Sequence, residues 1–196
     1  MAQERVNEVF SSSSLTGQVA TITGAGRGNG RATASRLGRM GASLFLSDIE
    51  PDLLEETLGE LKDHGYEVSG GVFDASKVAE AERLVARVVD TYGRIDILVN
   101  NAGASRPQAF PEVSEEMWDW TLDLNLKGPY FIMQEAAKVM IEQRSGCVVN
   151  TASISAWGGM TSSPPYAAAK AGVVTMTVTA AAYLGTYGIR VNAVAP

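Results

Sequence analysis

The sequence has very few of the side chains that bind metals or form disulfides, with one cysteine and one histidine among 196 residues. A single cysteine, Cys147, excludes a disulfide within the chain and is typical of a reducing compartment, so we expect a cytoplasmic protein. The one histidine, His64, precedes Gly65 at the end of a predicted helix, where we expect an exposed cap that interacts with the helix dipole. Because no cluster of histidines and cysteines exists, we expect no metal site.

Basic charge and long apolar runs are also scarce. Lysine and arginine number 16 against 22 acidic residues, and the net charge of −6 argues against a surface for nucleic acid or an anionic membrane. No continuous apolar run approaches the ~18 to 20 residues of a transmembrane helix. The polar N-terminus resembles neither a signal peptide nor an acid-poor transit peptide. Because it ends in four serines, we expect residues 1–14 to form a flexible arm.

Short apolar or β-branched runs alternate with longer amphipathic stretches from residue 19 onward. The expected strands are 19–23, 43–47, 67–73, 95–100, 147–151 and 190–194, and the expected helices lie near 28–40, 52–64, 77–91, 114–143 and 165–186. Apolar strands separated by helices are typical of a parallel sheet with helices on both faces. The sequence therefore predicts one doubly wound, three-layer α/β domain of the Rossmann type over residues 15–196. In such sheets a ligand binds at the carboxyl ends of the strands.

A glycine-rich turn, TGAGRGNG, follows the first strand at residues 23–30. Gly24, Gly28 and Gly30 permit a tight turn, a close approach of the backbone to a pyrophosphate and an open helix N-terminus. The pattern is TGxxxGxG, and GxGxxG fails because Asn29 stands where that pattern needs glycine. An ordinary strand-to-helix turn with spare glycines is the alternative. The place of the turn between the first strand and the first helix favours a dinucleotide-binding turn.

Asp48 ends the second strand, 18 residues after Gly30, near the position where an acid accepts hydrogen bonds from the adenosine ribose. A carboxylate there repels a 2′-phosphate and favours NAD over NADP. Arg27 and Arg31 argue the other way, because they attract that phosphate. We expect NAD, since Asp48 is the better placed of these side chains. The alternative is that Asp48 caps a helix or faces solvent in a turn.

Two further strand ends carry candidate binding residues. Asp74, before Ala75, follows the third strand and is a candidate acceptor for the adenine amino group, although a simple turn role is nearly as compatible with its spacing. The fourth strand is followed by NNAG at residues 100–103. This motif places small residues and two amides where the backbone must run close to a ligand.

Ser153 lies just beyond the fifth strand, and Tyr166 and Lys170 follow it. The proline pair at 164–165 is able to start a helix, on which Tyr166 and Lys170 share one face. A tyrosine hydroxyl with a pKa of about 10 needs about 4 kcal/mol of help to work as an acid/base near neutrality. A lysine ammonium about 4 Å away supplies about that much at an effective dielectric of about 20. The alternative is an ordinary amphipathic helix surface.

With these motifs the sequence resembles the short-chain dehydrogenase/reductase family, in its single-domain branch. The likeness extends from about Leu15 to Pro196 through TGAGRGNG, Asp74, NNAG, Asn125, Ser153, YAAAK at 166–170 and RVNAVAP at 190–196. It implies reversible hydride transfer between a nicotinamide cofactor, NAD rather than NADP, and a secondary alcohol or carbonyl compound. It also implies a homotetramer or homodimer built partly on the helices near 114–143 and 165–186.

Carried over by position, the catalytic residues of the family are Asn125, Ser153, Tyr166 and Lys170. Tyr166 would be the acid/base, Ser153 would bond the substrate oxygen, and Lys170 would lower the pKa of the tyrosine and hold the nicotinamide ribose. Asn125 would fix a water that relays protons past Lys170. The cofactor would lie against Gly24, Arg27, Gly28, Asn29, Gly30, Asp48, Asp74, Ala75, Asn101, Ala102, Gly103, Tyr166, Lys170 and Pro196.

The sequence departs from the family pattern at two places. Asn29 replaces the usual apolar residue and is expected to cap the helix and to alter cofactor affinity. The chain stops at Pro196, where the family continues with a substrate-covering segment, a helix and a seventh strand, so we expect a cut edge and a missing final edge strand.

Alternatives to an active dehydrogenase remain. They are a truncated, inactive piece, a non-catalytic dinucleotide-binding sensor or scaffold, and an epimerase or dehydratase. The complete catalytic set argues against the sensor, because binding alone does not need an activated tyrosine. Trp157 is a candidate substrate contact.

Overall fold

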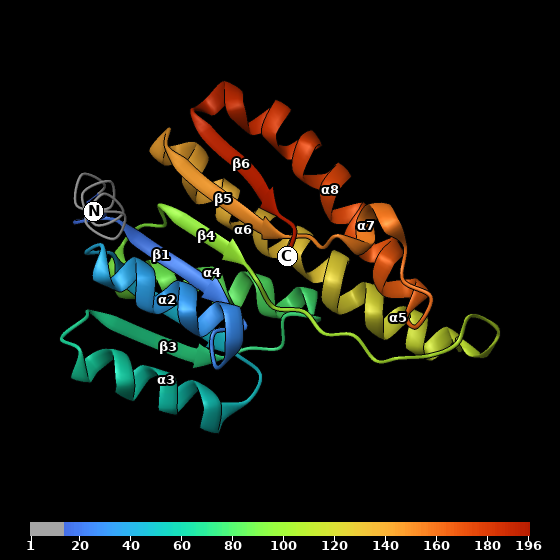
Figure 1. Ribbon diagram of the computed structural model, residues 1–196. Coiled ribbons are helices and arrows are strands. Elements are labelled where there is room, and N and C mark those ends of the chain that lie inside the picture. Colours follow the sequence, from blue (N-terminus) through green and yellow to red (C-terminus); the bar gives the residue numbers. More distant parts are fainter. Residues whose placement is uncertain (1–13) are drawn as a thin grey trace, which may run out of the picture.

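The computed structural model describes residues 14–196, and the expected N-terminal arm lies, except for Ser14, outside the described residues. One parallel sheet runs through the described chain in the order β3-β2-β1-β4-β5-β6 (Figure 1). Its strands are β1 (Val19–Thr23), β2 (Ser43–Asp48), β3 (Val68–Val72), β4 (Ile97–Asn100), β5 (Gly146–Thr151) and β6 (Ile189–Val194). Each predicted strand is confirmed to within two residues at either end, and the doubly wound fold is confirmed.

Helices cover both faces of the sheet. They are α2 (Gly28–Arg39), α3 (Pro51–Asp63), α4 (Val78–Tyr92), α5 (Glu115–Leu122), α6 (Gly128–Gln143), α7 (Ser155–Gly158) and α8 (Pro164–Leu184). Strand side chains alternate between the two layers because successive residues of a strand point to opposite faces. Val19 and Phe45 belong to the core beneath α4, α6 and α8, whereas Ala20 and Leu44 belong to the core beneath α2 and α3. This alternation produces the predicted three layers.

The stretch predicted as one helix over 114–143 is interrupted. Between α5 and α6 the chain forms a π-helical turn, Asp123–Lys127, and the Gly128 amide donates to the Asp123 carbonyl five residues earlier. Pro129 follows at the start of α6. Proline has no backbone N–H, so inside a continuous α-helix it would leave the carbonyl four residues earlier without a hydrogen-bond donor. The wider π-helical turn accommodates the missing donor. The sequence prediction missed the interruption, which holds Asn125 in a fully buried position.

The helix α8 is the longest in the described chain and the most apolar. By length and composition alone, the helical stretch Pro164–Tyr187 is able to cross a membrane, which corrects the expectation that no stretch approaches that size. In the structure this helix packs against β6 and α7 and buries Ala169, Lys170 and Val173. Within the described chain, 33% of its apolar stretch is buried, and the rest is exposed or partly exposed.

The end of α3 agrees with its sequence prediction. His64 follows Asp63, is exposed, and donates its backbone N–H to the Glu60 carbonyl. Its ring atom Nδ1 lies 2.8 Å from the same carbonyl oxygen. The histidine is thus a helix cap at the amino-terminal edge of the sheet, remote from the ends where the candidate residues gather.

Candidate active site

The candidate residues gather where the strands end. All six strands are parallel, so their carboxyl ends meet at one edge of the sheet, toward which the arrowheads in Figure 1 point. This edge holds the glycine-rich turn after β1, Asp48 at the end of β2, Asp74 after β3, the segment 100–103 at the end of β4, and Ser153 after β5. It is the position where doubly wound sheets bind ligands.

Glycine is required in the turn after β1 for steric and conformational reasons. A Cβ atom on Gly30 would lie 2.1 Å from the Gly24 carbonyl oxygen, so no larger residue fits there. Gly28 has φ of +56°, a conformation that favours glycine. The helix α2 begins at Gly28, and its N-cap residue Arg27 makes no side-chain capping bond. The first amides of α2 are therefore available to an anion.

Asn29 does not cap the helix, contrary to the sequence expectation. It is the second residue of α2 and is exposed, so its side chain stands two residues after Arg27, which is the N-cap. The helix α2 begins at Gly28, one residue before Asn29, so Arg27 is the N-cap residue.

The segment after β4 is joined to the end of β1. The Thr23 hydroxyl accepts the backbone N–H groups of Asn101 and Ala102 at 3.1 and 3.0 Å. The Asn101 side chain donates to the carbonyls of Thr23 and Gly24, each at 3.0 Å. Asn101 thus holds the glycine turn in place with its amide, a bracing role that the sequence did not indicate. Thr23 was also missed as a partner of this segment.

Both candidate acids are fixed by backbone amides. Asp48 accepts the Gly26 N–H through Oδ2 at 2.8 Å and the Glu50 N–H through Oδ1 at 3.1 Å. Asp74 accepts the backbone N–H and the hydroxyl of Ser76 through Oδ1 at 2.9 and 2.7 Å. Each carboxylate has about four acceptor sites, so both retain capacity for a ligand. For Asp74, the turn role is the one seen in the structure.

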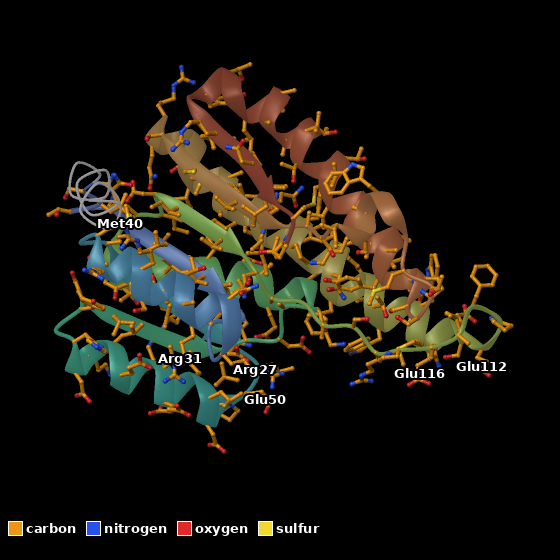
Figure 2. All side chains as sticks on the ribbon, viewed as in Figure 1. Arg27, Arg31, Met40, Glu50, Glu112 and Glu116 are labelled. Carbon is orange, nitrogen blue, oxygen red and sulfur yellow. The ribbon has the colours of Figure 1, made fainter. Side chains whose placement is uncertain are left out.

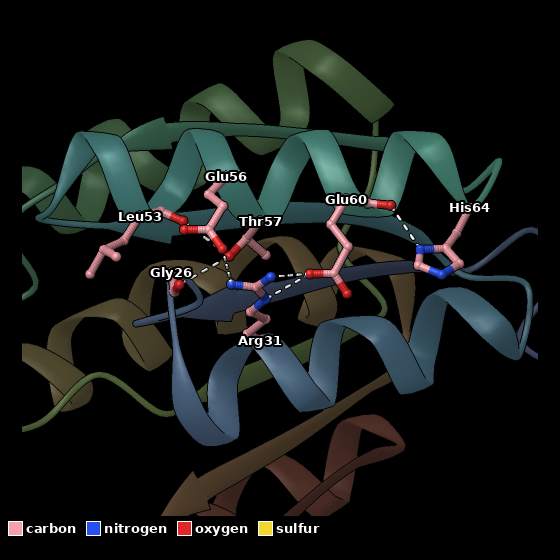
Figure 3. Close-up of polar contacts among 7 residues, drawn as sticks. All are labelled: Gly26, Arg31, Leu53, Glu56, Thr57, Glu60 and His64. Atoms are coloured by element: carbon pink, nitrogen blue, oxygen red, sulfur yellow. Dashed lines mark hydrogen bonds and ion pairs between the residues drawn. The ribbon is translucent and has the colours of Figure 1, made fainter.

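The two arginines near the turn have different surroundings. Arg31 of α2 forms ion pairs with two carboxylates of α3: its Nη1 lies 2.8 Å from Glu56 Oε1 and its Nε lies 2.8 Å from Glu60 Oε2 (Figure 3). The hydrogen bonds that Arg31 donates to Glu56 and to Glu60, in that order of effect, raise the pKa of Arg31. Arg27 is exposed at the start of α2 (Figure 2). The sequence did not reveal the pairing of Arg31, because Glu56 and Glu60 lie 25 and 29 residues away.

A buried lysine lies at the centre of the site. Lys170 is 3% exposed, and its Nζ donates to the Thr151 carbonyl at 2.7 Å. Burial lowers its pKa to about 8. The same Nζ lies 5.5 Å from the centre of the Tyr166 ring, which agrees with the predicted sharing of one helix face. An ammonium carries three protons, so Lys170 has donors beyond the one given to Thr151.

Asn125 and Gly103 lie beside this lysine. Asn125 donates its side-chain amide to the carbonyls of Ala104 and Thr121 at 2.8 and 2.9 Å. Its Oδ1 is buried and has no hydrogen-bond partner among residues 14–196. A Cβ on Gly103 would lie 2.7 Å from that Oδ1 and 3.4 Å from Lys170 Nζ. The missing side chain at 103 therefore leaves room for a polar group between an unpaired acceptor and a cation.

The remaining candidates lie on the segments around β5 and β6. The Ser153 hydroxyl accepts the Ser155 N–H at 3.2 Å, at the start of the short helix α7 that the sequence did not predict. The backbone N–H of Ile154 donates to the Pro196 carbonyl at 3.2 Å, which joins the end of β6 to the Ser153 loop. Trp157 is 69% exposed and remains a candidate substrate contact.

These residues fit a dinucleotide. The glycine turn supplies unpaired amides for a diphosphate, Asp48 has free acceptor capacity for ribose hydroxyls, and Lys170 has free donors for a second ribose. Among residues 14–196 no group of three or more metal-binding side chains is present.

Comparisons with known proteins agree with this geometry. A family model described as short chain dehydrogenase matches residues 18–196. A dehydrogenase subunit from Thauera aromatica, named for (2S)-[(R)-hydroxy(phenyl)methyl]succinyl-CoA, is 42% identical over 93% of this chain and 73% of its own. The solved structure of NAD+-bound xylitol dehydrogenase is 32% identical, with a TM-score of 0.90 over 93% of this chain and 70% of its own. A variant of actinorhodin polyketide ketoreductase with NADPH is 39% identical, with a TM-score of 0.88 over 91% of this chain and 69% of its own.

Proposed function

This chain belongs to the short-chain dehydrogenase family, and from that premise we propose that Tyr166 is the general acid/base for hydride transfer between NAD and a secondary alcohol or ketone. Membership makes the chain an oxidoreductase that uses a nicotinamide cofactor and a small-molecule substrate. One observation supports the role of Tyr166 above all: the buried Lys170 ammonium lies against its ring.

When bound, the nicotinamide supplies or accepts the hydride. In the reduction direction the Tyr166 hydroxyl donates its proton to the substrate oxygen, and in the oxidation direction the Tyr166 phenolate accepts it. The Lys170 cation stabilises the phenolate because opposite charges attract strongly at a buried site. Ser153 donates a hydrogen bond to the same substrate oxygen and orients it.

Asn125 has a separate role in this proposal. Its unpaired Oδ1 and the free donors of Lys170 suit a bridging water, which needs polar partners in a site that is otherwise closed. Through Lys170 and that water, a proton reaches Tyr166 after each reduction and leaves Tyr166 after each oxidation. The π-helical turn at Asp123–Lys127 supports this role because it holds Asn125 at a fixed, buried point.

We propose NAD as the preferred cofactor. Relatives include an NAD+ complex and an NADPH complex, so membership alone does not decide between them. The charges around the ribose position support NAD. Asp48 keeps a carboxylate there, and Arg31 is paired with Glu56 and Glu60 and is therefore less available to a 2′-phosphate. We take residues 24–30, 74, 75, 101–103 and 196 as the other cofactor contacts, by position in the family pattern.

We also propose a homotetramer or homodimer in the cytoplasm, with residues 15–196 as its catalytic domain. Exposed apolar side chains on α6 and α8 support an interface there, among them Tyr130 at 44%, Val178 at 66% and Tyr183 at 63% exposure. Molar mass from light scattering tests this expectation, and a monomer at micromolar concentration would refute it.

NADH formation with a panel of secondary alcohols tests the central proposal. Tyr166→Phe is expected to lower kcat by roughly 10²- to 10⁴-fold, because it removes the phenolate that accepts the alcohol proton in this direction, while the Kd for NADH stays near the wild-type value. Tyr66→Phe is the matched control, since Tyr66 precedes β3 at the opposite edge of the sheet. A wild-type chain that binds NADH but turns over no alcohol or ketone would instead support the non-catalytic sensor.

A further inference from the structure

Thr57, on α3, is a polar residue with no exposed surface. Its hydroxyl oxygen lies 3.0 Å from two carbonyl oxygens, those of Leu53 and Gly26, and its single proton is shared between these two acceptors. The Leu53 contact is the ordinary bond of a helical threonine to the residue four positions earlier. The Gly26 contact is different, because it crosses from α3 to the glycine-rich turn 31 residues away (Figure 3).

Gly26 is held from both sides. Its N–H donates to Asp48 Oδ2 at 2.8 Å, and its carbonyl accepts from the Thr57 hydroxyl. A Cβ at this position would lie 2.9 Å from the Leu53 Cβ, so the turn packs directly onto α3. Gly26, which is bonded to Asp48 on one side and to Thr57 on the other, therefore has one defined orientation.

That orientation fixes the next amide along the chain. In a trans peptide the carbonyl of one residue and the N–H of the next point in opposite directions, and every peptide bond among residues 14–196 is trans. Because the Gly26 carbonyl points to α3, the Arg27 N–H points away from α3. Arg27 is the N-cap residue of α2, so its N–H lies next to the unpaired first amides of that helix.

We propose that Thr57 is a positioning residue for cofactor binding: its hydroxyl orients the Gly26–Arg27 peptide so that the Arg27 N–H joins the amides that bind the diphosphate. Glycine at 26 leaves this peptide free to rotate, and the hydroxyl removes that freedom before the cofactor arrives. The inference rests on the proposed function, because it assumes that a dinucleotide binds at this turn.

The neighbours of Thr57 allow the effect of its hydroxyl on cofactor binding to be measured separately from the packing of α3 against α2. The adjacent Glu56, and Glu60 one turn later, bind Arg31 of α2 by ion pairs that do not involve the threonine hydroxyl. The two helices therefore keep their contact when the hydroxyl is removed. A valine at 57 preserves the shape of the side chain and loses only the donor.

Thr57→Val is expected to raise the Kd for NADH and for ADP-ribose by about five- to tenfold, the loss that one hydrogen bond accounts for. The Kd for adenosine, which has no diphosphate, stays unchanged, and kcat at saturating NADH stays within about twofold of wild type. Thr57→Ser restores both diphosphate ligands. Thr91→Val is the matched control, because the Thr91 hydroxyl donates only to the Arg87 carbonyl of its own helix at 2.7 Å.

Equal NADH affinity in wild type and Thr57→Val would overturn the proposal. Equal weakening of adenosine and ADP-ribose, or a Thr57→Ser chain as weak as Thr57→Val, would also overturn it, because a packing defect has that pattern. If Thr57→Val does not fold, the Kd values for NADH, ADP-ribose and adenosine are measured on Thr57→Ala, which also lacks the hydroxyl and adds no methyl group. Failure of the wild-type chain to bind NADH at all would refute the proposed function itself, and the two failures are thus distinct.

Discussion

Replacement of Lys170 by methionine is expected to stabilise the free protein while it removes activity. Lys170 is 3% exposed, and burial lowers its pKa from 10.5 to about 8. That fall corresponds to about 3 kcal/mol of free energy that folding loses whenever the lysine is charged. Methionine has a similar length and no charge, so Lys170→Met removes this cost. The lost bond to the Thr151 carbonyl offsets about 1 kcal/mol of the gain.

The pH dependence has a definite sign. Below the folded pKa of about 8, lysine is charged in both states and the whole cost is present. Between pH 8 and about 10.5 the folded lysine is neutral while the unfolded one still binds its proton, so wild-type stability rises with pH. The advantage of Lys170→Met is therefore about 2 kcal/mol at pH 7 and decreases by about 3 kcal/mol as the pH approaches 10.5.

Urea unfolding of the cofactor-free protein at pH 7, 8, 9 and 10 measures this advantage. Lys138→Met is the matched control, because Lys138 is an exposed residue of α6 with 64% of its side chain accessible, and its replacement is expected to have little effect at any of these pH values. A Lys170→Met variant that is less stable than wild type at pH 7, or whose advantage does not change between pH 7 and 10, would refute the reasoning.

Two further predictions concern the glycine turn and the charges beside it. Gly30→Ala is expected to destabilise the fold by about 2 kcal/mol or more in urea unfolding, because the new Cβ would lie 2.1 Å from the Gly24 carbonyl oxygen; helix propensity alone predicts a gain, so a stabilised variant would contradict the close packing. The double replacement Glu56→Gln, Glu60→Gln frees Arg31 and removes two negative charges near the ribose position. The ratio of the Kd for NADP to the Kd for NAD is expected to fall by about three- to tenfold, and an unchanged ratio would remove the support that this pairing gives to NAD.

The local features of the chain were predictable because they depend on residues close together in sequence. Apolar runs separated by amphipathic stretches predicted the six strands, and the spacing of Tyr166 and Lys170 predicted their contact on α8. The errors were also local in origin. The π-helical turn before Pro129 was missed because helical periodicity hardly changes when one residue is added to a turn. The capping role expected for Asn29 was wrong because it depends on the residue at which α2 begins, and a helix start is hard to place to within one or two residues from the sequence.

The sequence by itself determined the parallel α/β fold and the glycine turn, since each follows from residue type and short-range spacing, and its resemblance to the family supplied the set of candidate catalytic side chains. Tertiary structure decided which distant groups meet. It paired Arg31 with Glu56 and Glu60, turned the Thr57 hydroxyl onto the Gly26 carbonyl, and left Asn125 Oδ1 without a partner beside Lys170. Burial also lowers the pKa of Lys170, because the cost of a buried charge depends on the atoms packed around it and no motif contains that information.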